Sequence, residues 1–383
     1  MRVLHTMGEL KPSGAEVMYL CAADLWQANG LQCEILSDGD TTGVLGVLAP
    51  KLAEAGYRIH QIPFRRSAKH VVAVYKFLRE QRYDVVHVNG ESACFWYSLA
   101  AYLAGTRRLF RTVHNVFPFR GLLRLERTLQ RWLMRLMGVQ MIAVSASVQR
   151  MEAERFCNRT RLISNWFNDS VFVAPSPATR QAARQQLALP GDAMVVTSVA
   201  GCGPAKNHEA ILYAVAQCAA DVSLIYLHVG QEDAAQSDRQ LATALGIADR
   251  VRFLGVLPPN RVVDALYASD AYVMPSRWEG LACSAIEALG AGTPAILANV
   301  PGLRDFAAVI PGIRWIEPTA ESLAAAIREL YALAPERRYE IGEKLSAAAH
   351  REFGRSKGAL QYLEMYESSG KSAPAARQKP AEP

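Results

Sequence analysis

The stretch from residue 271 to residue 298 constrains the fold more tightly than its neighbours do. It begins with a short apolar run, Ala271–Met274, and ends with a second one, Ala295–Ala298, and both have the composition of buried strands. Between them lie a loop, a short helical segment and the helix-stopping residues Gly290 and Gly292. The order strand, loop, helix, strand predicts one parallel βαβ unit.

Two glutamates in this unit indicate its ligand. The loop after the first strand of a βαβ unit faces the ligand crevice, and the start of the helix offers unpaired N–H groups and a positive dipole end to an anion. Glu279 lies in that loop and Glu287 about a turn into the helix, while Gly280 lets the backbone approach a bulky anion. Carboxylates accept hydrogen bonds from hydroxyl groups, so the pair indicates a nucleotide sugar, which carries hydroxyls on both sides of a diphosphate.

Residues 275–294 read P-S-x-x-E-G-x-x-x-x-x-x-E-A-x-x-x-G-x-P, which resembles the donor-site signature of family 4 retaining glycosyltransferases of the GT-B fold. The resemblance implies that Glu279 contacts the donor sugar and that Glu287 contacts the ribose hydroxyls. It also implies that the backbone N–H groups of Gly280, Leu281 and Ala282 stabilise the diphosphate. The alternative is an ordinary helix with a solvated glutamate.

The resemblance extends to about residue 366 and implies an α/β protein of the GT-B fold, with two facing Rossmann-like domains and a cleft between them. A chain of 383 residues fits this, since domains average roughly 150 residues. The expected parts are an N-terminal acceptor-side domain at 1–170, a linker at 171–192, a nucleotide-sugar-binding domain at 193–353, a helix crossing back at 354–367, and a disordered tail at 368–383.

In the first domain, Gly14 and His114 are the candidate site residues. The opening segment lacks the G-x-G-x-x-G spacing of dinucleotide binders, and the resemblance places the family's paired-glycine loop at Ser13 and Gly14, facing the diphosphate. His114 ends a predicted strand, where the resemblance places a histidine near the donor sugar and the acceptor. A neutral imidazole there could transfer a proton, although a satisfied polar residue is the alternative, and His87 is a weaker candidate.

In the second domain, residues 201–208 resemble the family's loop G-R-L-x-x-x-K-N/G, whose arginine and lysine neutralise the diphosphate. Lys206 matches the lysine, whereas Gly201 stands at the arginine position. Because a bidentate cation is lost, Arg277 is the candidate replacement. The resemblance also places the strand with Arg252 and Phe253 beside the nucleotide base.

The segment 119–137 is predicted to be a helix with a basic stripe beside apolar faces. The basic stripe consists of Arg120, Arg124, Arg127 and Arg131, and the aromatic residue beside it is Trp132. A basic stripe next to tryptophan and leucines is typical of a helix lying on a membrane surface, and the acceptor would then be lipid-linked. An ordinary core-facing helix with a solvated basic face is the alternative.

Composition excludes several other classes of protein. Forty-two basic and 36 acidic residues leave a net charge of +6, too small an excess to indicate nucleic acid as a partner. The seven cysteines are scattered without C-x-x-C pairs, and Asp38-Gly39-Asp40 has the chemistry of a turn, so neither a disulfide framework nor a metal site is expected. No apolar run reaches the roughly 20 residues of a spanning helix, so the expected location is the cytoplasm, with at most a peripheral contact on the inner face of the membrane.

These features together predict a retaining hexosyltransferase without a metal or other cofactor. Its partners would be a nucleotide-sugar donor and a glycan or lipid-linked acceptor, and the family's usual role favours bacterial surface polysaccharide or glycolipid assembly. Two alternatives stay open. One is a GT-B nucleotide-sugar epimerase, which turns over the donor without an acceptor. The other is a non-catalytic GT-B subunit of a glycan-assembly complex, which is suggested by Gly201 at the position of the family's arginine. A nicotinamide-dependent oxidoreductase is disfavoured because its glycine fingerprint is absent.

Overall fold

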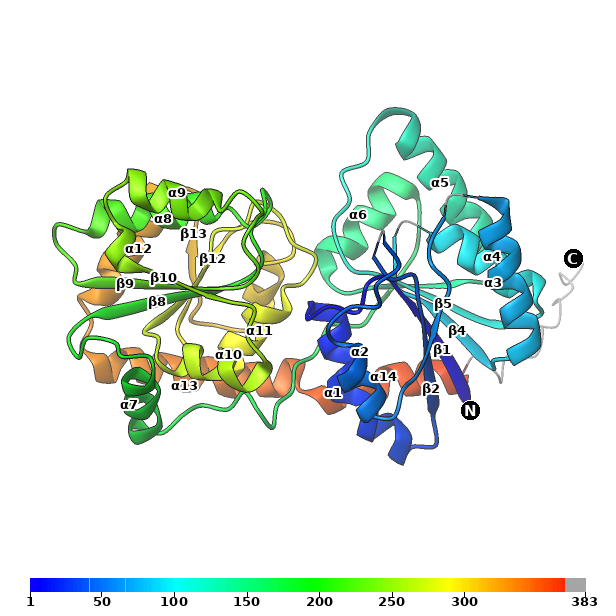
Figure 1. Cartoon of the computed structure of the whole chain (residues 1–383), viewed down its shortest axis with the longest axis horizontal. Helices are drawn as coiled ribbons and strands as arrows, with labels where there is room; N and C mark the ends of the chain where they lie inside the picture. The colour runs from blue at the N-terminus through cyan, green and yellow to red at the C-terminus, as the bar shows by residue number, and fades with distance from the viewer. Residues whose placement is uncertain (41, 66, 92, 369–383) are drawn as a thin grey trace, which may run out of the picture.

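The computed structural model describes residues 1–40, 42–65, 67–91 and 93–368, which form two α/β domains lying side by side (Figure 1). Each domain is built on a parallel β-sheet with helices on both faces. The predicted pair of Rossmann-like domains is therefore confirmed. Apart from Ser368, the tail expected at 368–383 lies outside the described residues.

The sheet of the first domain has the strand order β3-β2-β1-β4-β5-β6-β7, so the order reverses between β1 and β4. The central strands are apolar and buried, as a parallel sheet covered on both faces requires. The strands are β1 (Arg2–Met7), β2 (Gln32–Ser37), β3 (Arg58–Gln61), β4 (Val85–Val88), β5 (Arg108–Val113), β6 (Gln140–Ala143) and β7 (Arg161–Leu162). The helices are α1 (Gly14–Ala28), α2 (Ala49–Glu54), α3 (Ala68–Gln81), α4 (Cys94–Leu103), α5 (Gly121–Leu136) and α6 (Ala146–Phe156).

The sheet of the second domain has the order β10-β9-β8-β11-β12-β13, and its reversal lies between β8 and β11. The strands are β8 (Met194–Val199), β9 (Leu224–Val229), β10 (Val251–Gly255), β11 (Ala271–Met274), β12 (Ala295–Ala298) and β13 (Arg314–Ile316). The helices are α7 (Pro177–Gln186), α8 (His208–Cys218), α9 (Ser237–Ala244), α10 (Pro259–Tyr267), α11 (Cys283–Gly290), α12 (Ala320–Tyr331) and α13 (Pro335–Phe353), with 3₁₀ turns at Ala248–Arg250 and Arg304–Ala308. In such sheets a ligand crevice opens at the carboxyl ends of the strands beside the reversal.

The segment 171–192, expected to be a plain linker, contains helix α7, which packs on the second domain. Arg180 donates to the carbonyl oxygen of Gly292 at 3.0 Å, and Arg184 lies 3.3 Å from the carboxylate of Asp270. Side chains of α7 therefore fasten it to the second domain, and the flexible part of the connection is shorter than the sequence indicates.

The last helix of the described chain, α14 (Arg355–Ser368), returns to the first domain (Figure 1). Helix α13 packs against α11, and after Gly354 the chain continues into α14, which packs against α1. The Nε1 of Trp26 donates to the carbonyl oxygen of Ala359 at 3.0 Å, and the hydroxyl of Tyr366 lies 2.5 Å from Nδ1 of His87. Buried side chains of α14 thus complete the core of a domain that begins more than 300 residues earlier.

We predict that Tyr366→Ala destabilises the first domain, because it removes a fully buried ring and leaves the buried imidazole of His87 without that hydroxyl partner. Deleting a buried aromatic side chain costs about 3 kcal/mol or more. Denaturant unfolding followed by circular dichroism should show a lower midpoint, and limited proteolysis should cut within α14. The control is Glu364→Ala on the exposed face of the same helix, and equal midpoints for the two variants would contradict the role assigned to α14.

Candidate active site

The starts of helices α1 and α11 meet at the boundary between the domains. A Cβ atom at Gly14, the first residue of α1, would lie 2.8 Å from Sγ of Cys283, the first residue of α11. Neither helix has a side-chain hydrogen bond capping its first turn. Uncapped first turns leave backbone N–H groups available, and the dipoles of both helices present positive ends, so this meeting point can hold an anion.

Lys206 and Glu279 form an ion pair beside this meeting point. The Nζ of Lys206 donates to Oε1 of Glu279 at 2.7 Å, and the Glu279 side chain is largely buried. The backbone oxygen of Glu279 packs against Gly302, which has a φ of +86° and where a Cβ would lie 2.3 Å from that oxygen. Glycine is therefore required at 302 to hold the loop of Glu279 in place.

Hydrogen bonds hold the loop carrying Lys206 against the loop carrying Glu279. The backbone N–H of Arg277 donates to the carbonyl oxygen of Ala205 at 2.8 Å. The amide of Asn207 donates to the carbonyl oxygens of Pro275 and Pro318, each at 3.0 Å. These bonds join the carboxyl ends of β8 and β11, on either side of the strand reversal, and place the predicted cation and carboxylate in one site.

Arg277 is the predicted substitute for the arginine that Gly201 replaces. It lies in the loop after β11, but its side chain runs toward Pro204 and Glu209. Its guanidinium donates to the carbonyl oxygen of Pro204 and lies 4.0 Å from Glu209, and its side chain is exposed. The structure thus brings Arg277 next to the loop of Lys206 without directing its guanidinium at the meeting point of the helices.

The two domains are in close contact at Gly280. A Cβ atom at Gly280 would lie 1.9 Å from the carbonyl oxygen of His114 in the other domain. Glycine is needed here because the backbones of the two domains touch, and the approach of Gly280 to an anion stays a prediction. Asn165 reinforces the contact, since its Nδ2 donates to the carbonyl oxygen of Leu281 at 2.9 Å. Leu281 and Ala282 are buried at this contact.

Glu287 is half-buried on α11, and its carboxylate has no partner among the described residues. Within the described ranges, no hydrogen bond or ion pair reaches that carboxylate. Because its surroundings exclude water, they raise the pKa of Glu287 to about 8. A crowded carboxyl group without a protein partner can accept hydrogen bonds from a ligand. This is the property that a contact with ribose hydroxyls requires.

His114 lies directly after β5, where its Nε2 is 3.1 Å from Oδ1 of Asn89. Burial, with a contribution from the charge of Arg111, lowers the pKa of His114 to about 4, so the imidazole is neutral near pH 7. Asn89 follows β4 and also accepts from the hydroxyl of Tyr19 at 3.0 Å. Asn89 was not among the residues predicted for the site, although it follows a strand just as His114 does.

The two residues predicted beside the nucleotide base point in different directions. Arg252 donates to the carbonyl oxygens of Leu187 and Ala188, which follow α7, so its guanidinium is occupied away from the site. The ring of Phe253 lies 5.4 Å from that of His228 and under the guanidinium of Arg239. Successive residues of a strand face opposite sides of the sheet, so Arg252 and Phe253 could not both have faced one base.

Two arginines of the basic stripe of α5 are buried, which corrects the prediction for Arg127 and Arg131. Arg131 is 1% exposed and contacts both carboxylate oxygens of Glu152, at 2.8 and 3.0 Å, while Arg127 donates to Gln130 at 3.0 Å. Buried arginines are stable only when paired in this way, and Glu152 is itself fully buried. Arg131 therefore holds α5 against α6, and both cations are buried and unavailable to a membrane.

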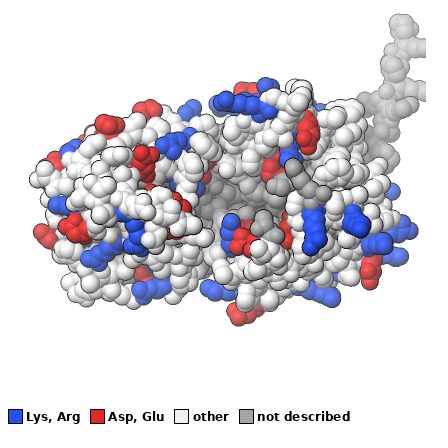
Figure 2. Space-filling model, turned by 45° about the horizontal axis from the view of Figure 1, so that its top comes forward, with Lys and Arg blue, Asp and Glu red and all other residues white. Residues whose placement is uncertain are grey.

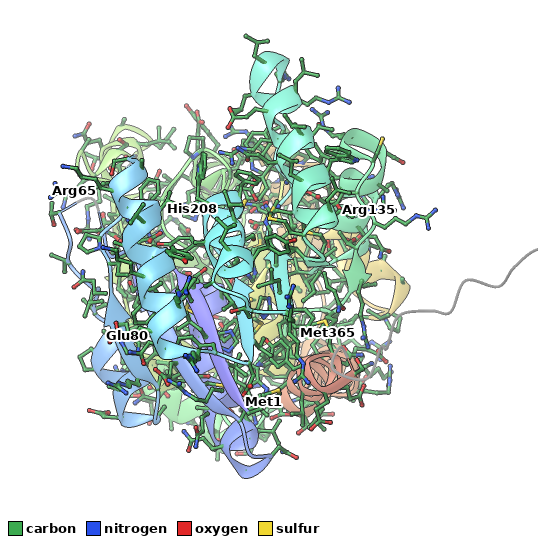
Figure 3. The ribbon with its side chains drawn as sticks, turned by 90° about the vertical axis from the view of Figure 1, so that its right-hand side faces the viewer. Met1, Arg65, Glu80, Arg135, His208 and Met365 are labelled. Atoms are coloured by element: carbon green, nitrogen blue, oxygen red, sulfur yellow. The ribbon has the colours of Figure 1, made fainter. Side chains whose placement is uncertain are left out.

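The outward face of α5 is apolar. The exposed hydrophobic residues of the helix are Leu122, Leu123, Leu125, Leu129, Trp132 and Leu136, and Leu122 is 84% exposed. Arg120, Arg124 and Arg135 are the exposed cations on or next to the helix. The beginning of α5 extends past the rest of the first domain, with Arg135 near its other end (Figure 3). We call these residues the α5 face.

Elsewhere the visible surface carries basic and acidic side chains interspersed (Figure 2). None of the helices in the described ranges is long and apolar enough to cross a membrane.

Two protein-family models match the chain, one in each domain. The model described as Glycosyltransferase Family 4 matches residues 12–171, and the one described as Glycosyl transferases group 1 matches residues 179–345. Together they span both sides of the candidate site.

The curated relatives match this chain over only part of their own length. The D-inositol 3-phosphate glycosyltransferase of Rhodococcus jostii is 41% identical over 135 residues, which is 33% of this chain and 30% of the relative. The UDP-Gal:alpha-D-GlcNAc-diphosphoundecaprenol alpha-1,3-galactosyltransferase of Escherichia coli is 26% identical over 255 residues, or 62% of this chain and 63% of the relative. The chain thus spans from about a third to under two thirds of the length of these relatives.

A solved structure matches nearly the whole chain. HepE of Anabaena in complex with UDP-glucose superimposes with a TM-score of 0.80 at 21% identity, covering 96% of this chain and 100% of that chain. At this identity the likeness shows the fold, and it confirms the predicted GT-B architecture.

The raised pKa of Glu287 predicts a pH-dependent stability. The unfolded chain releases this proton near pH 4.5, whereas the folded chain keeps it until about pH 8. The folded state binds more protons in this window, so the contribution of Glu287 to the free energy of unfolding falls as pH rises from 4.5 to 8. Glu287→Gln cannot ionise and should therefore melt at a higher temperature than wild type at pH 8.5 and at the same temperature near pH 4.5.

Thermal denaturation without nucleotide across this pH range tests the prediction. Glu364→Gln, at an exposed position of α14, is the control and should follow wild type. Parallel pH curves for wild type and Glu287→Gln would refute the raised pKa.

Proposed function

Because the chain belongs to family 4 of the GT-B glycosyltransferases, we propose that it moves a sugar from a nucleotide-sugar donor to a hydroxyl acceptor with retention of the anomeric configuration. The observation that carries the proposal is the meeting of the α1 and α11 helix starts, with Lys206 and Glu279 beside them. The positive helix ends at that position suit a diphosphate. Glu279 and Glu287, on its two sides, would accept hydrogen bonds from hydroxyl groups of the donor.

The proposed donor is a UDP-sugar. HepE, of the same fold, is described in complex with UDP-glucose, and the galactosyltransferase relative is named for UDP-Gal. Glu287 would accept from the ribose hydroxyls and Glu279 would orient the sugar.

The proposed chemistry follows the charge that develops on the leaving diphosphate. When the anomeric bond breaks, negative charge gathers on the phosphate oxygens, and Lys206 and the N–H groups at the start of α11 stabilise it. The acceptor attacks from the leaving-group face and gives its proton to a phosphate oxygen, which retains the anomeric configuration. The neutral imidazole of His114 would lie beside the sugar as a hydrogen-bond partner. The proposed transfer step uses no metal, since Lys206 and the positive ends of the two helices supply the positive charge beside the diphosphate.

The proposed acceptor is a lipid-linked glycan or glycolipid at the inner face of a bacterial membrane. The α5 face supports this, because its leucines and Trp132 are exposed next to Arg120, Arg124 and Arg135. Apolar side chains flanked by cations bind a surface of anionic lipids, with the apolar part entering the boundary between headgroups and acyl chains.

We predict that UDP and UDP-sugars bind wild type more tightly than GDP or ADP compounds, as measured by calorimetry. At pH 9, above the pKa of about 8 of Glu287, Glu287→Gln replaces a charged acceptor by a neutral one. Since hydrogen bonds to charged groups contribute about 1.5–3 kcal/mol, binding of both UDP and uridine at that pH should weaken about tenfold or more. Lys206→Met should weaken UDP binding and leave uridine binding unchanged, because uridine carries no phosphate. Lys51→Met, on the exposed surface of α2, is the control.

Absence of binding by any nucleotide would contradict the donor site. Binding without turnover on any lipid-linked or glycan acceptor would favour the non-catalytic subunit, and donor turnover without acceptor would favour the epimerase. Proton NMR of the product compares its anomeric configuration with that of the donor, and inversion would contradict retention.

We predict that the protein floats with vesicles containing phosphatidylglycerol and less with neutral vesicles, and that the emission of Trp132 shifts to shorter wavelength on binding. Burying one leucine contributes about 1.5 kcal/mol or more, so Leu125→Glu and Leu129→Glu should each weaken vesicle binding at least about tenfold. Leu333→Glu, at an exposed apolar position in the second domain, is the control. Equal flotation of all variants would show that the α5 face does not contact lipid.

A further inference from the structure

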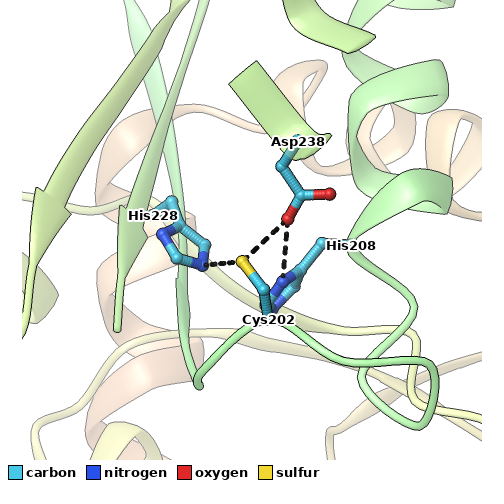
Figure 4. A group of neighbouring side chains, drawn as sticks. All are labelled: Cys202, His208, His228 and Asp238. Carbon is cyan, nitrogen blue, oxygen red and sulfur yellow. Dashed lines mark hydrogen bonds and ion pairs between the residues drawn. The ribbon is translucent and has the colours of Figure 1, made fainter. Parts of the chain in front are cut away.

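Four potential metal ligands meet at one end of the second sheet (Figure 4). Cys202 lies in the loop after β8, His208 begins α8, His228 lies near the end of β9, and Asp238 lies in the first turn of α9. Each offers one ligand atom, and these atoms all lie within 4.8 Å of one another. Four separate segments of the chain therefore direct a thiol, two imidazoles and a carboxylate at one point.

The distances between the ligand atoms fit a tetrahedral ion. With usual zinc bond lengths, the edges of such a tetrahedron are about 3.4 Å between nitrogen and oxygen and about 3.6 Å from sulfur. The Nδ1 of His208 lies 3.3 Å from Oδ2 of Asp238, and the Sγ of Cys202 lies 3.6 Å from Nε2 of His228. The third contact, between Sγ of Cys202 and the same Asp238 oxygen, is 3.0 Å. Small movements would bring all four atoms to bonding distance of one ion.

The two imidazoles lack the partners that buried polar groups normally have. His208 is 4% exposed and His228 is completely buried. Among the described residues, Nε2 of His208 and Nδ1 of His228 make no hydrogen bond, and the contact of His208 Nδ1 with Asp238 at 3.3 Å does not have hydrogen-bond geometry. Buried polar side chains are otherwise nearly always hydrogen-bonded, and an ion bonded to Nδ1 of His208 would supply the partner that this atom lacks.

We propose that Cys202, His208, His228 and Asp238 bind one Zn²⁺ ion. Thiolate and imidazole ligands favour zinc over Mg²⁺ and Ca²⁺, which prefer oxygen ligands throughout. On binding, the thiol proton of Cys202 passes to solvent and the sulfur becomes a thiolate ligand. The sequence did not indicate this site, because its ligands are spread from residue 202 to residue 238 at spacings that match no common zinc motif.

The ion would act on structure, since four protein ligands leave no open coordination position for substrate. Its consequence for the site comes from two of the ligands. Cys202 and His208 flank residues 203–207, the loop that carries Lys206. A zinc ion would fasten both ends of that loop to β9 and α9 and so fix Lys206 near the helix starts. This inference does not depend on the chain's being a transferase.

The test measures the metal itself. Protein without an affinity tag is purified without chelators, and zinc is quantified by inductively coupled plasma mass spectrometry. We expect about one zinc per chain in wild type, and a loss of at least tenfold in Cys202→Ala and in His228→Ala. Cys218→Ala and Cys157→Ala are the controls, a buried and an exposed cysteine outside the cluster, and should keep the metal.

Cobalt substitution reports the ligand set. Wild type stripped of metal and loaded with Co²⁺ should show the intense visible bands of a tetrahedral site and a thiolate-to-cobalt band in the near ultraviolet, and the latter should be absent in Cys202→Ala. Stripping should lower the melting temperature of wild type, and zinc should restore it. Circular dichroism of each variant separates loss of metal from loss of fold.

Wild type without zinc, even after incubation with ZnCl₂, would overturn the proposal, as would variants that bind zinc as wild type does. Because nucleotide binding is measured separately, a failure here leaves the proposed donor site standing, and the reverse also holds.

Discussion

The positive ends of two helices lie together at the domain boundary, and the rest of the active site depends on this arrangement. Helices α1 and α11 begin in different domains, and Gly14 is small enough for their first residues to touch. Like partial charges so close repel each other, so the closed arrangement is best stabilised by an anion that both helices contact. The backbone contact between Gly280 and His114 holds the domains at this separation. An anion at this point would therefore draw the two helix starts together.

The fold and the centre of the site could be predicted because they depend on local pattern. The strand, loop and helix around Glu279 and Glu287 follow from apolar runs and glycines that are adjacent in sequence, and the structure has them as β11, a loop and α11. Lys206 was identified from the resemblance of residues 201–208 to the family's loop. In each case the element that carries the residue also determines where it faces.

The rest could not be predicted because it depends on partners distant in sequence. Periodicity showed that α5 has a basic side and an apolar side but not which side is covered, and the buried carboxylate of Glu152 draws Arg131 inward while the leucines stay outside. The same holds for Arg252, whose guanidinium is bound by carbonyl groups about 64 residues away. Cys202 and His228 also meet only after β8 and β9 have paired.

Helix α14 has a consequence for the order in which the protein forms during synthesis. The core of the first domain includes Trp26, near the beginning of the chain, and Ala359 and Tyr366, which are translated more than 300 residues later. Strands β1 to β7 can pair early, but their apolar cover stays incomplete until the second domain has been translated. The nascent first domain must therefore expose a surface that a chaperone or its own later helix has to cover, and loop closure over this distance makes that last step slow.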